Sequence, residues 1–445
     1  MAGGTWTTQN KVRPSVYIRF KSASGVGLTV GERGKVAICE PMSWGPVGKV
    51  MEVANGADTT PFCGYDITNP KAMFLREIFK GTNRTSPPTM VYLYRPPADS
   101  SEQAKATIAP LTATALYPGI RGNDITIVIT EDADNENVFT VSTVVDGMVV
   151  DAQEASTVGQ LKANDWVTFT GTGSLVANVG TTLTGGADGT IQTAAYSTFL
   201  NNIEAYNFDI LIYDGKESTV LTAMQSFVKR LTEENGQYCQ LVAAGITNPD
   251  SRFVINVNSG AILDDGTELT IQQVCWWAGG AEAGAKYNES LTYASYPGAV
   301  QATPVMTNND YINALNDGEL VLFTDDGVVK IEQDINSLIT FTPDIGKVYH
   351  KNRVMRLCNT IANDVYQQFS QNFLGIVNNN EEGRALFKAA IVGYMLELQS
   401  AQAIQNFSAD DVEVLPGNDI DSIVINIAIQ AVDSTEKVYM TVTVG

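Results

Sequence analysis

The strongest constraint on this chain is that strand-forming segments stand at both of its ends without an obvious partner beside them. Near the N-terminus, Val16, Ile18 and Phe20 share one face of an alternating segment, which is the period-two pattern of a half-buried strand. Residues 1–11 before it are polar and rich in Gly and Thr, so they offer no second strand. The pairing partner of this N-terminal arm, residues 1–22, must be distant in the sequence or lie in another chain.

The C-terminal end shows the same period. Apolar residues occupy every second position in two runs, first Ile423, Ile425 and Ile427, and then Val438, Met440 and Val442. The polar pair Asp433-Ser434 separates the two runs. We therefore expect a β-hairpin arm over residues 419–445 that ends the protein.

Between these arms the composition changes along the chain. Residues 23–98 mix short strands with a helix that begins at Pro70, and we assign them to the first part of a core domain. Residues 99–189 are dense in Val, Thr and Ile with turn residues at regular spacing, which is typical of a small β-sandwich or barrel. They carry three Lys or Arg and twelve Asp or Glu, a net charge of −9. We predict an acidic all-β domain inserted into the core.

Residues 190–418 alternate between strand and helix patterns and continue the core. A continuously apolar run at 209–213 precedes an amphipathic helix over 217–234 and a second strand at 238–243. This order implies parallel strands joined by a right-handed crossover. Two long helices follow Pro343. The predicted fold class is an α/β (α+β) core domain with an inserted small all-β domain and extended N- and C-terminal arms.

Composition excludes several classes of function. The only His is His350, and the five Cys are dispersed without a CxxC pair, so a multi-His zinc site, a zinc ribbon and a thioredoxin-type motif are all ruled out. The net charge of −21 argues against nucleic acid or an anionic membrane as partner, because both attract patches of Lys and Arg. We expect no cofactor and no metal.

The sequence also predicts where the chain is made. Its beginning lacks the apolar core of a signal peptide. The most apolar long segment, 385–398, is interrupted by Lys388 and Glu397, and it is too short to span a bilayer. Scattered cysteines suit a reducing compartment. We therefore expect folding in the cytoplasm and no insertion into a membrane.

One stretch of this acidic chain is basic. Its cationic residues are Lys347, His350, Lys351, Arg353 and Arg356. Arg353 and Arg356 are three positions apart on an expected helix and lie away from its apolar stripe, so we predict that they project as a pair. The stretch is either a solvated helix start or a cationic face that docks an acidic partner surface.

A second interpretation of the core is a doubly wound enzyme. Asp214 directly follows the apolar strand 209–213 and precedes Gly215 and a helix, which is where such folds bind ligands. An ordinary Asp-Gly turn that leads into a helix explains the same residues. A third interpretation, based on the terminal strands and the high Thr, Asn and Gln content, is a self-assembling tube or shell protein.

Four segments in order point to one family. They are Arg13-Pro14-Ser15-Val16-Tyr17-Ile18, the stretch LTGGADG at 183–189, INSLITF at 335–341 with NRVMR at 352–356, and DSTEKVYM at 433–440. Together they resemble the contractile tail sheath proteins of tailed phages and phage-derived bacteriocin particles over nearly the whole chain. The first segment has Ser15 where the family pattern RPGVYI has Gly.

The resemblance implies a structural subunit and no enzyme. Such subunits form stacked rings around an inner tail tube, contact baseplate and tail terminator proteins, and exchange strands between neighbours. Assembly would take place in the cytoplasm of a host bacterium, and the product would be the tail of a virion or particle. The arm residues named above would then pair between subunits, and Lys347, Lys351, Arg353 and Arg356 would face the tube. The extended sheath would be metastable, and its contraction would drive the tube through a cell envelope.

Overall fold

The computed structural model describes residues 30–135 and 137–444, which form two compact units. One unit comprises residues 31–363 together with the C-terminal residues from 431 onward, and the other comprises residues 364–430. The predicted N-terminal strand with Val16, Ile18 and Phe20 lies outside the described residues.

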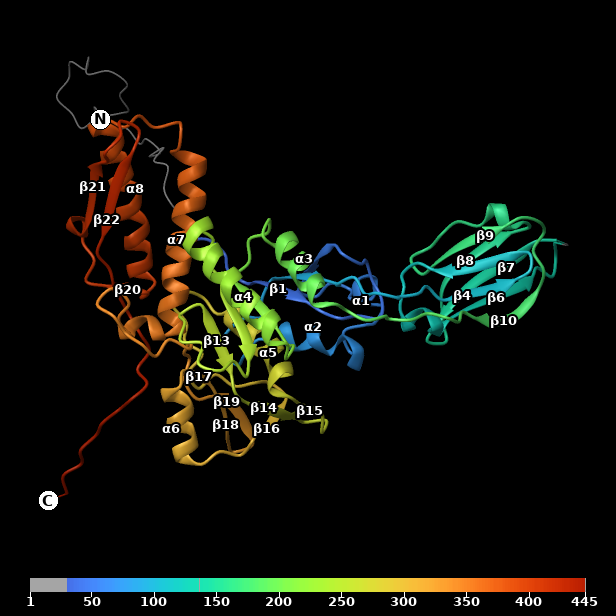
Figure 1. The fold of residues 1–445 in the computed structure, drawn as a ribbon, viewed down its shortest axis with the longest axis horizontal. Coiled ribbons are helices and arrows are strands. Elements are labelled where there is room, and N and C mark those ends of the chain that lie inside the picture. The colour runs from blue at the N-terminus through green and yellow to red at the C-terminus, as the bar shows by residue number, and fades with distance from the viewer. Residues whose placement is uncertain (1–29, 136, 445) are drawn as a thin grey trace, which may run out of the picture. The chain divides into compact units, whose positions relative to one another are not determined.

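A seven-stranded sheet forms the centre of the larger unit (Figure 1). In spatial order its strands are β17 (Glu319–Leu320), β13 (Val254–Val257), β12 (Gln240–Ala244), β11 (Ile210–Tyr213), β1 (Lys35–Cys39), β3 (Met90–Tyr94) and β2 (Val50–Ala54). Every neighbouring pair is parallel except β2 with β3. The strand order reverses between β1 and β11, so the predicted parallel core is a doubly wound sheet.

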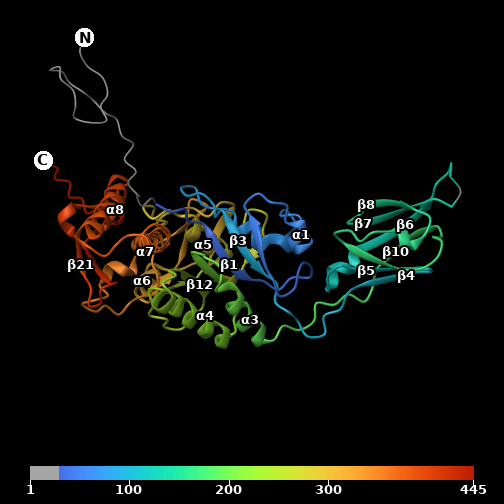
Figure 2. The ribbon, with the colours of Figure 1, turned by 90° about the horizontal axis from the view of Figure 1, so that it is seen from above.

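Helices cover both faces of this sheet, because alternate strand residues point to opposite sides. Val36 and Ile38 of β1 pack in a cluster with α2 (Met73–Ile78) and α5 (Ile271–Gly284). Ala37 and Cys39 join the cluster of α3 (Thr193–Ile203) and α4 (Ser218–Arg230). Figure 2 shows α3 and α4 on one side of the sheet and α5 on the other.

Helix α5 is buried along most of its length and approaches its neighbours very closely. A Cβ atom at Gly280 would lie 2.0 Å from the carbonyl oxygen of Ile78, and one at Gly279 would lie 2.4 Å from the Ile212 side chain. The two glycines therefore let α5 contact both α2 and the sheet. Trp277 on the same helix stacks on Tyr296 with 4.0 Å between ring centroids.

Two antiparallel sheets pack around a third apolar cluster, whose buried residues all lie between positions 104 and 183 except Trp44. One contains β10 (Asn178–Thr182), β6 (Ile125–Glu131), β7 (Phe139–Val145) and β8 (Met148–Ala155), and the other contains β4 (Lys105–Ile108), β5 (Leu111–Ala115) and β9 (Val167–Gly171). Alternate residues of β7 are buried, as a sandwich requires. The prediction of a mixed α/β chain with a β-sandwich is confirmed.

The remaining elements of the larger unit complete the core next to the strand ends. They are α1 (Thr60–Cys63), β14 (Gly260–Leu263), β15 (Glu268–Leu269), β16 (Ala299–Thr303), α6 (Asn308–Asn316) and the hairpin of β18 (Leu322–Asp325) with β19 (Val328–Ile331). The hairpin turns at Asp326-Gly327, where both residues have positive φ angles, which is the conformation that an Asp-Gly pair favours in a two-residue turn.

The unit of residues 364–430 contains the end of α7 (Asn352–Asn372), α8 (Glu381–Ser400), β20 (Ile404–Gln405), β21 (Val412–Pro416) and β22 (Ile423–Ile427), and it ends in β23 (Gln430–Ala431). Strand β22 pairs antiparallel with β21. The predicted hairpin over residues 419–445 is therefore wrong. The first apolar run, which forms β22, pairs with the strand before it and not with the second run. In the short connection between β21 and β22 the Gly417 amide donates to the Ser422 carbonyl oxygen. Residues 432–444 form no strand.

Candidate functional site

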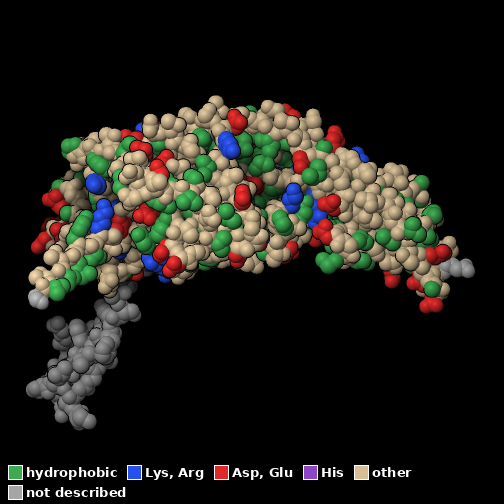
Figure 3. Space-filling view, turned by 90° about the horizontal axis from the view of Figure 1, so that it is seen from below, with side chains coloured by type: hydrophobic (Ala, Val, Ile, Leu, Met, Phe, Trp, Pro, Cys, Tyr) green, Lys and Arg blue, Asp and Glu red, His purple; other side chains and the backbone are tan. Residues whose placement is uncertain are grey.

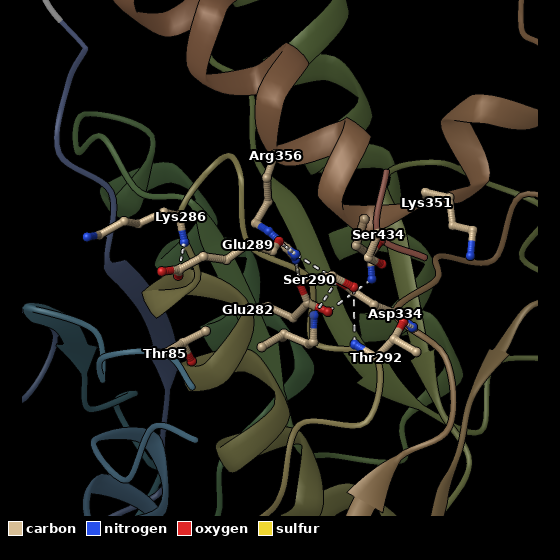
Figure 4. A network of polar contacts seen from close by, with 12 residues as sticks. Thr85, Glu282, Lys286, Glu289, Ser290, Thr292, Asp334, Lys351, Arg356 and Ser434 are labelled. Carbon is tan, nitrogen blue, oxygen red and sulfur yellow. Dashed lines mark hydrogen bonds and ion pairs between the residues drawn. The ribbon is translucent and has the colours of Figure 1, made fainter. Parts of the chain in front are cut away.

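A buried ionic cluster lies where α7 begins (Figure 4). The Arg356 guanidinium donates to the Glu282 carboxylate of α5, to Asp334 Oδ2 at 2.6 Å and to the Glu289 carbonyl oxygen at 2.6 Å. Asn352 Nδ2 donates to Glu282 Oε1 at 3.0 Å. Arg356 is 0% exposed, so this cluster joins α5 and α7 inside the protein.

The charges of this cluster do not balance unless one carboxyl group keeps a proton. Two carboxyl groups face a single guanidinium, and all three groups are buried. Burial and the nearby Asp334 raise the pKa of Glu282. Burial alone would raise the pKa of Asp334 as well, but Arg356 holds it below its ordinary value. We infer that Glu282 carries the proton and donates it toward Asp334.

The predicted projection of Arg353 and Arg356 as a pair is wrong. Arg356 is enclosed in the cluster, and Arg353 is only 9% exposed. The face of α7 that carries Arg356 meets neither solvent nor a partner protein, because Glu282 and Asp334 of the same chain cover it. Lys347, which comes before the helix, is exposed.

Lys351 is engaged by the C-terminal segment. Its ammonium group pairs with Glu436 and lies 3.9 Å from Asp433 Oδ2. The Glu436 carboxylate also accepts hydrogen bonds from Thr292 Oγ1 at 2.8 Å and from Gln333 Nε2 at 2.5 Å. The segment around residue 436 is therefore attached to the body of the larger unit.

Beyond this attachment the chain leaves the surface. The side chains of Val438, Met440 and Val442, three predicted arm residues, are between 73% and 79% exposed. Such a row of exposed apolar side chains at alternate positions is typical of a strand that lacks its partner.

The smaller unit presents a sheet of two strands, β21 and β22. The other predicted arm residues, Ile423, Ile425 and Ile427, lie on β22 and are half-buried, whereas Val424 and Asn426 on the opposite face are exposed. The sheet packs against α8. Two strands rarely make a stable sheet without further support, and each has an outer edge to which a strand can be added.

Asp214, the residue that suggested an enzyme, and His350 both have structural contacts. The Asp214 carboxylate accepts a hydrogen bond from the Trp276 indole at 2.8 Å, and burial raises its pKa. His350 is buried with Nδ1 2.6 Å from the Leu338 carbonyl oxygen, and burial lowers its pKa. Among residues 30–135 and 137–444, no group of three or more His, Cys, Asp or Glu is arranged to hold a metal ion.

Charge and hydropathy of the described residues add two observations. On the face drawn in Figure 3, Lys and Arg side chains occur in small groups among uncharged and acidic surface. No helix within the described part of the chain combines the length and apolar character needed to cross a bilayer.

Comparison with known proteins identifies related chains. Family models of the phage tail sheath match in sequence order: the Gp18 domain III N-terminal region at residues 33–95, the β-sandwich domain at 99–188, the central domain at 189–337 and the C-terminal domain at 344–445. The phage-like element PBSX protein XkdK of Bacillus subtilis is 34% identical, with full coverage of both chains.

Solved structures agree with these matches. The sheath tail protein of Desulfitobacterium hafniense is 39% identical, with a TM-score of 0.86 over 96% of this chain and 99% of that one. The helical sheath of the anti-feeding prophage in its contracted state is 12% identical, with a TM-score of 0.59 over 97% of this chain and 99% of that one. The second likeness is one of fold alone.

Proposed function

Because the chain belongs to the phage tail sheath protein family, we propose that it is the subunit of a contractile sheath. Copies would polymerise as stacked rings around an inner tail tube in a metastable extended state. Contraction would then drive the tube through a cell envelope. The same fold occurs in the contracted sheath of the anti-feeding prophage, which supports contraction as the working step.

The observation that carries this proposal is that the chain has both an unpaired apolar segment at its C-terminus and a small sheet with unpaired edges. Residues 438–444 expose apolar side chains at alternate positions, and the sheet of β21 and β22 has outer edges. A C-terminal strand from one subunit added to this sheet of a neighbour would satisfy both. Each apolar side chain buried in this way contributes about 1.5–3 kcal/mol, offset in part by the ordering of the arm. The N-terminal arm with Val16, Ile18 and Phe20 is proposed to add a second strand.

Flexible strand links explain how the sheath could change length and stay intact. The exchanged strands would hold neighbouring subunits together. The bodies of these subunits would move relative to each other as the contacts between subunits improve. Free energy stored in the extended packing would be released on contraction. This mechanism requires no catalytic residue, and neither Asp214 nor His350 has a role in it.

The proposed tube-facing surface is now smaller than the sequence indicated. Of Lys347, Lys351, Arg353 and Arg356, only Lys347 is exposed, and Lys351 is paired with Glu436. We assign the tube contact to Lys347 and its neighbours. Baseplate and tail terminator proteins are the other proposed partners, and assembly is placed in the cytoplasm of the host bacterium.

Electron microscopy of the purified full-length chain tests the proposal. Wide hollow cylinders are expected from the intact chain, and a chain that ends at Lys437 should remain folded but form none. A narrow tube or flat sheet would favour another assembly protein, and discrete particles that bind a small ligand would favour an enzyme. Cylinders that persist at normal yield without residues 438–445 would contradict strand exchange through the C-terminal arm.

A further inference from the structure

The Glu436 side chain of the C-terminal segment occupies a socket of three hydrogen-bond donors on the larger unit. The Glu436 carboxylate accepts from Thr292 Oγ1 at 2.8 Å and Gln333 Nε2 at 2.5 Å and pairs with the Lys351 ammonium. Its side chain is 11% exposed. The three donors come from three different segments of the larger unit, so the carboxylate bridges all of them.

Internal bonds hold two of the three donor residues, Thr292 and Lys351, independently of the C-terminal segment. Thr292 Oγ1 accepts from the Asp334 amide at 3.0 Å, and Asp334 belongs to the Arg356 cluster. Lys351 immediately precedes α7 and forms a β-bridge with Ile335. The socket is therefore part of the rigid core.

The charge of Glu436 is also stabilised at this position. Burial would raise its pKa, but the hydrogen bonds from Lys351, Gln333 and Thr292 hold it below the ordinary value. The carboxylate therefore remains ionised at neutral pH, and hydrogen bonds to a charged group are the stronger kind.

We infer that Glu436 is a positioning residue that pins the C-terminal segment to the core and fixes the point from which the exchanged strand departs. This inference rests on the proposed sheath function. Beyond Glu436, residues 437–445 can extend over about 30 Å at roughly 3.3 Å for each residue. Without the pin the reach would begin after β23, and residues 432–445 would span about 46 Å.

The pin therefore sets both the length and the direction of the link. Lengthening a flexible link from nine to fourteen residues lowers the effective concentration of its free end about two-fold, because this concentration falls with roughly the −3/2 power of length. The loss of a fixed direction of departure lowers it further. A subunit without the pin should therefore link to its neighbour more slowly.

Lys437 supplies a built-in reporter of the pin. Trypsin cleaves after Lys437 only when the flanking residues can extend into the protease, and the anchored Glu436 is the adjacent residue. Release of the peptide 438–445 from the dilute, unassembled full-length chain can be followed by mass spectrometry. We expect Glu436→Gln to be cleaved at least ten-fold faster than the wild type, and the exposed-carboxylate control Glu268→Gln to be cleaved at the wild-type rate.

Substitution of the partner separates a pin from a general loss of stability. Lys351→Met should also speed cleavage, Lys351→Arg should keep it slow, and the double variant Lys351→Met/Glu436→Gln should be no faster than the faster single variant. All variants should keep the wild-type melting temperature within a few degrees. Wild-type cleavage rates in both single variants, or additive effects in the double variant, would overturn the pin.

The assembly measurement distinguishes this inference from the proposed function. If wild-type chains form no cylinders, the sheath proposal fails whatever the cleavage rates are. If wild-type chains do form cylinders, Glu436→Gln should form them at least two-fold more slowly at limiting concentration, as judged by light scattering and microscopy. Faster cleavage of Glu436→Gln together with wild-type assembly kinetics would overturn the role of the pin in linking subunits.

Discussion

The proton that Glu282 carries and directs toward Asp334 in the Arg356 cluster, here called the shared proton, makes the free energy of unfolding depend on pH. This dependence should change when Glu282 is replaced. In the folded chain Glu282 is protonated at a pH where the unfolded chain has lost this proton, because burial and Asp334 raise its pKa. A raised folded-state pKa contributes stability at low pH that is lost as the pH rises. The free energy of unfolding should therefore fall with pH between the ordinary pKa of a glutamate and the higher folded value.

The magnitude follows from the number of protons involved. One proton that is bound in the folded state and absent in the unfolded state changes stability by about 1.4 kcal/mol for each pH unit. Glu282→Gln removes this proton but keeps a neutral group that can donate to Asp334 and accept from Arg356 and Asn352. Between pH 5.5 and 7.5 the variant should therefore gain up to about 3 kcal/mol relative to the wild type.

Urea unfolding followed by tryptophan fluorescence measures this difference, at concentrations where light scattering shows no polymer. The wild type, Glu282→Gln and the exposed control Glu268→Gln would be compared at pH 5.5, 6.5 and 7.5. The control should track the wild type at each pH. A difference between Glu282→Gln and the wild type that does not change with pH, or that favours the wild type more strongly at higher pH, would refute the shared proton.

Three further predictions concern packing, capping and docking. Gly280→Ala should destabilise the subunit by about 1–3 kcal/mol, because its Cβ would strike the Ile78 carbonyl. The control Gly393→Ala on α8 meets no atom within 4 Å and should stabilise the subunit by up to about 1 kcal/mol. Thermal unfolding measures both effects. Thr270→Ala removes the capping box that begins α5 and should cost about 0.5–2 kcal/mol in urea unfolding, and an unchanged midpoint would contradict this. Lys347→Glu should reduce cosedimentation with inner tubes and leave the melting temperature unchanged, and normal cosedimentation would remove Lys347 from the tube contact.

Local pattern predicted the elements that have one clear environment. The strand at 209–213 is continuously apolar because both of its faces are buried, and the helix α4 has an apolar stripe because only one of its faces is buried. Helix α5 was missed because it is buried on nearly all sides and carries two consecutive glycines, so it shows no apolar stripe. The capping pair Thr270 and Gln273 was the available local signal for its beginning.

The candidate site shows where sequence patterns fail for a physical reason. Helical spacing placed Arg356 off the apolar face of α7, but it could not reveal that Glu282, 74 positions earlier, and Asp334 fill the space opposite. A charge near an apolar stripe has two stable solutions, solvent or a buried partner, and only tertiary contacts select between them. The choice matters for experiments, because Arg356→Glu would place a third acid among two buried carboxyl groups. Loss of assembly in that variant would report misfolding, so only substitutions at the exposed Lys347 can test the tube contact.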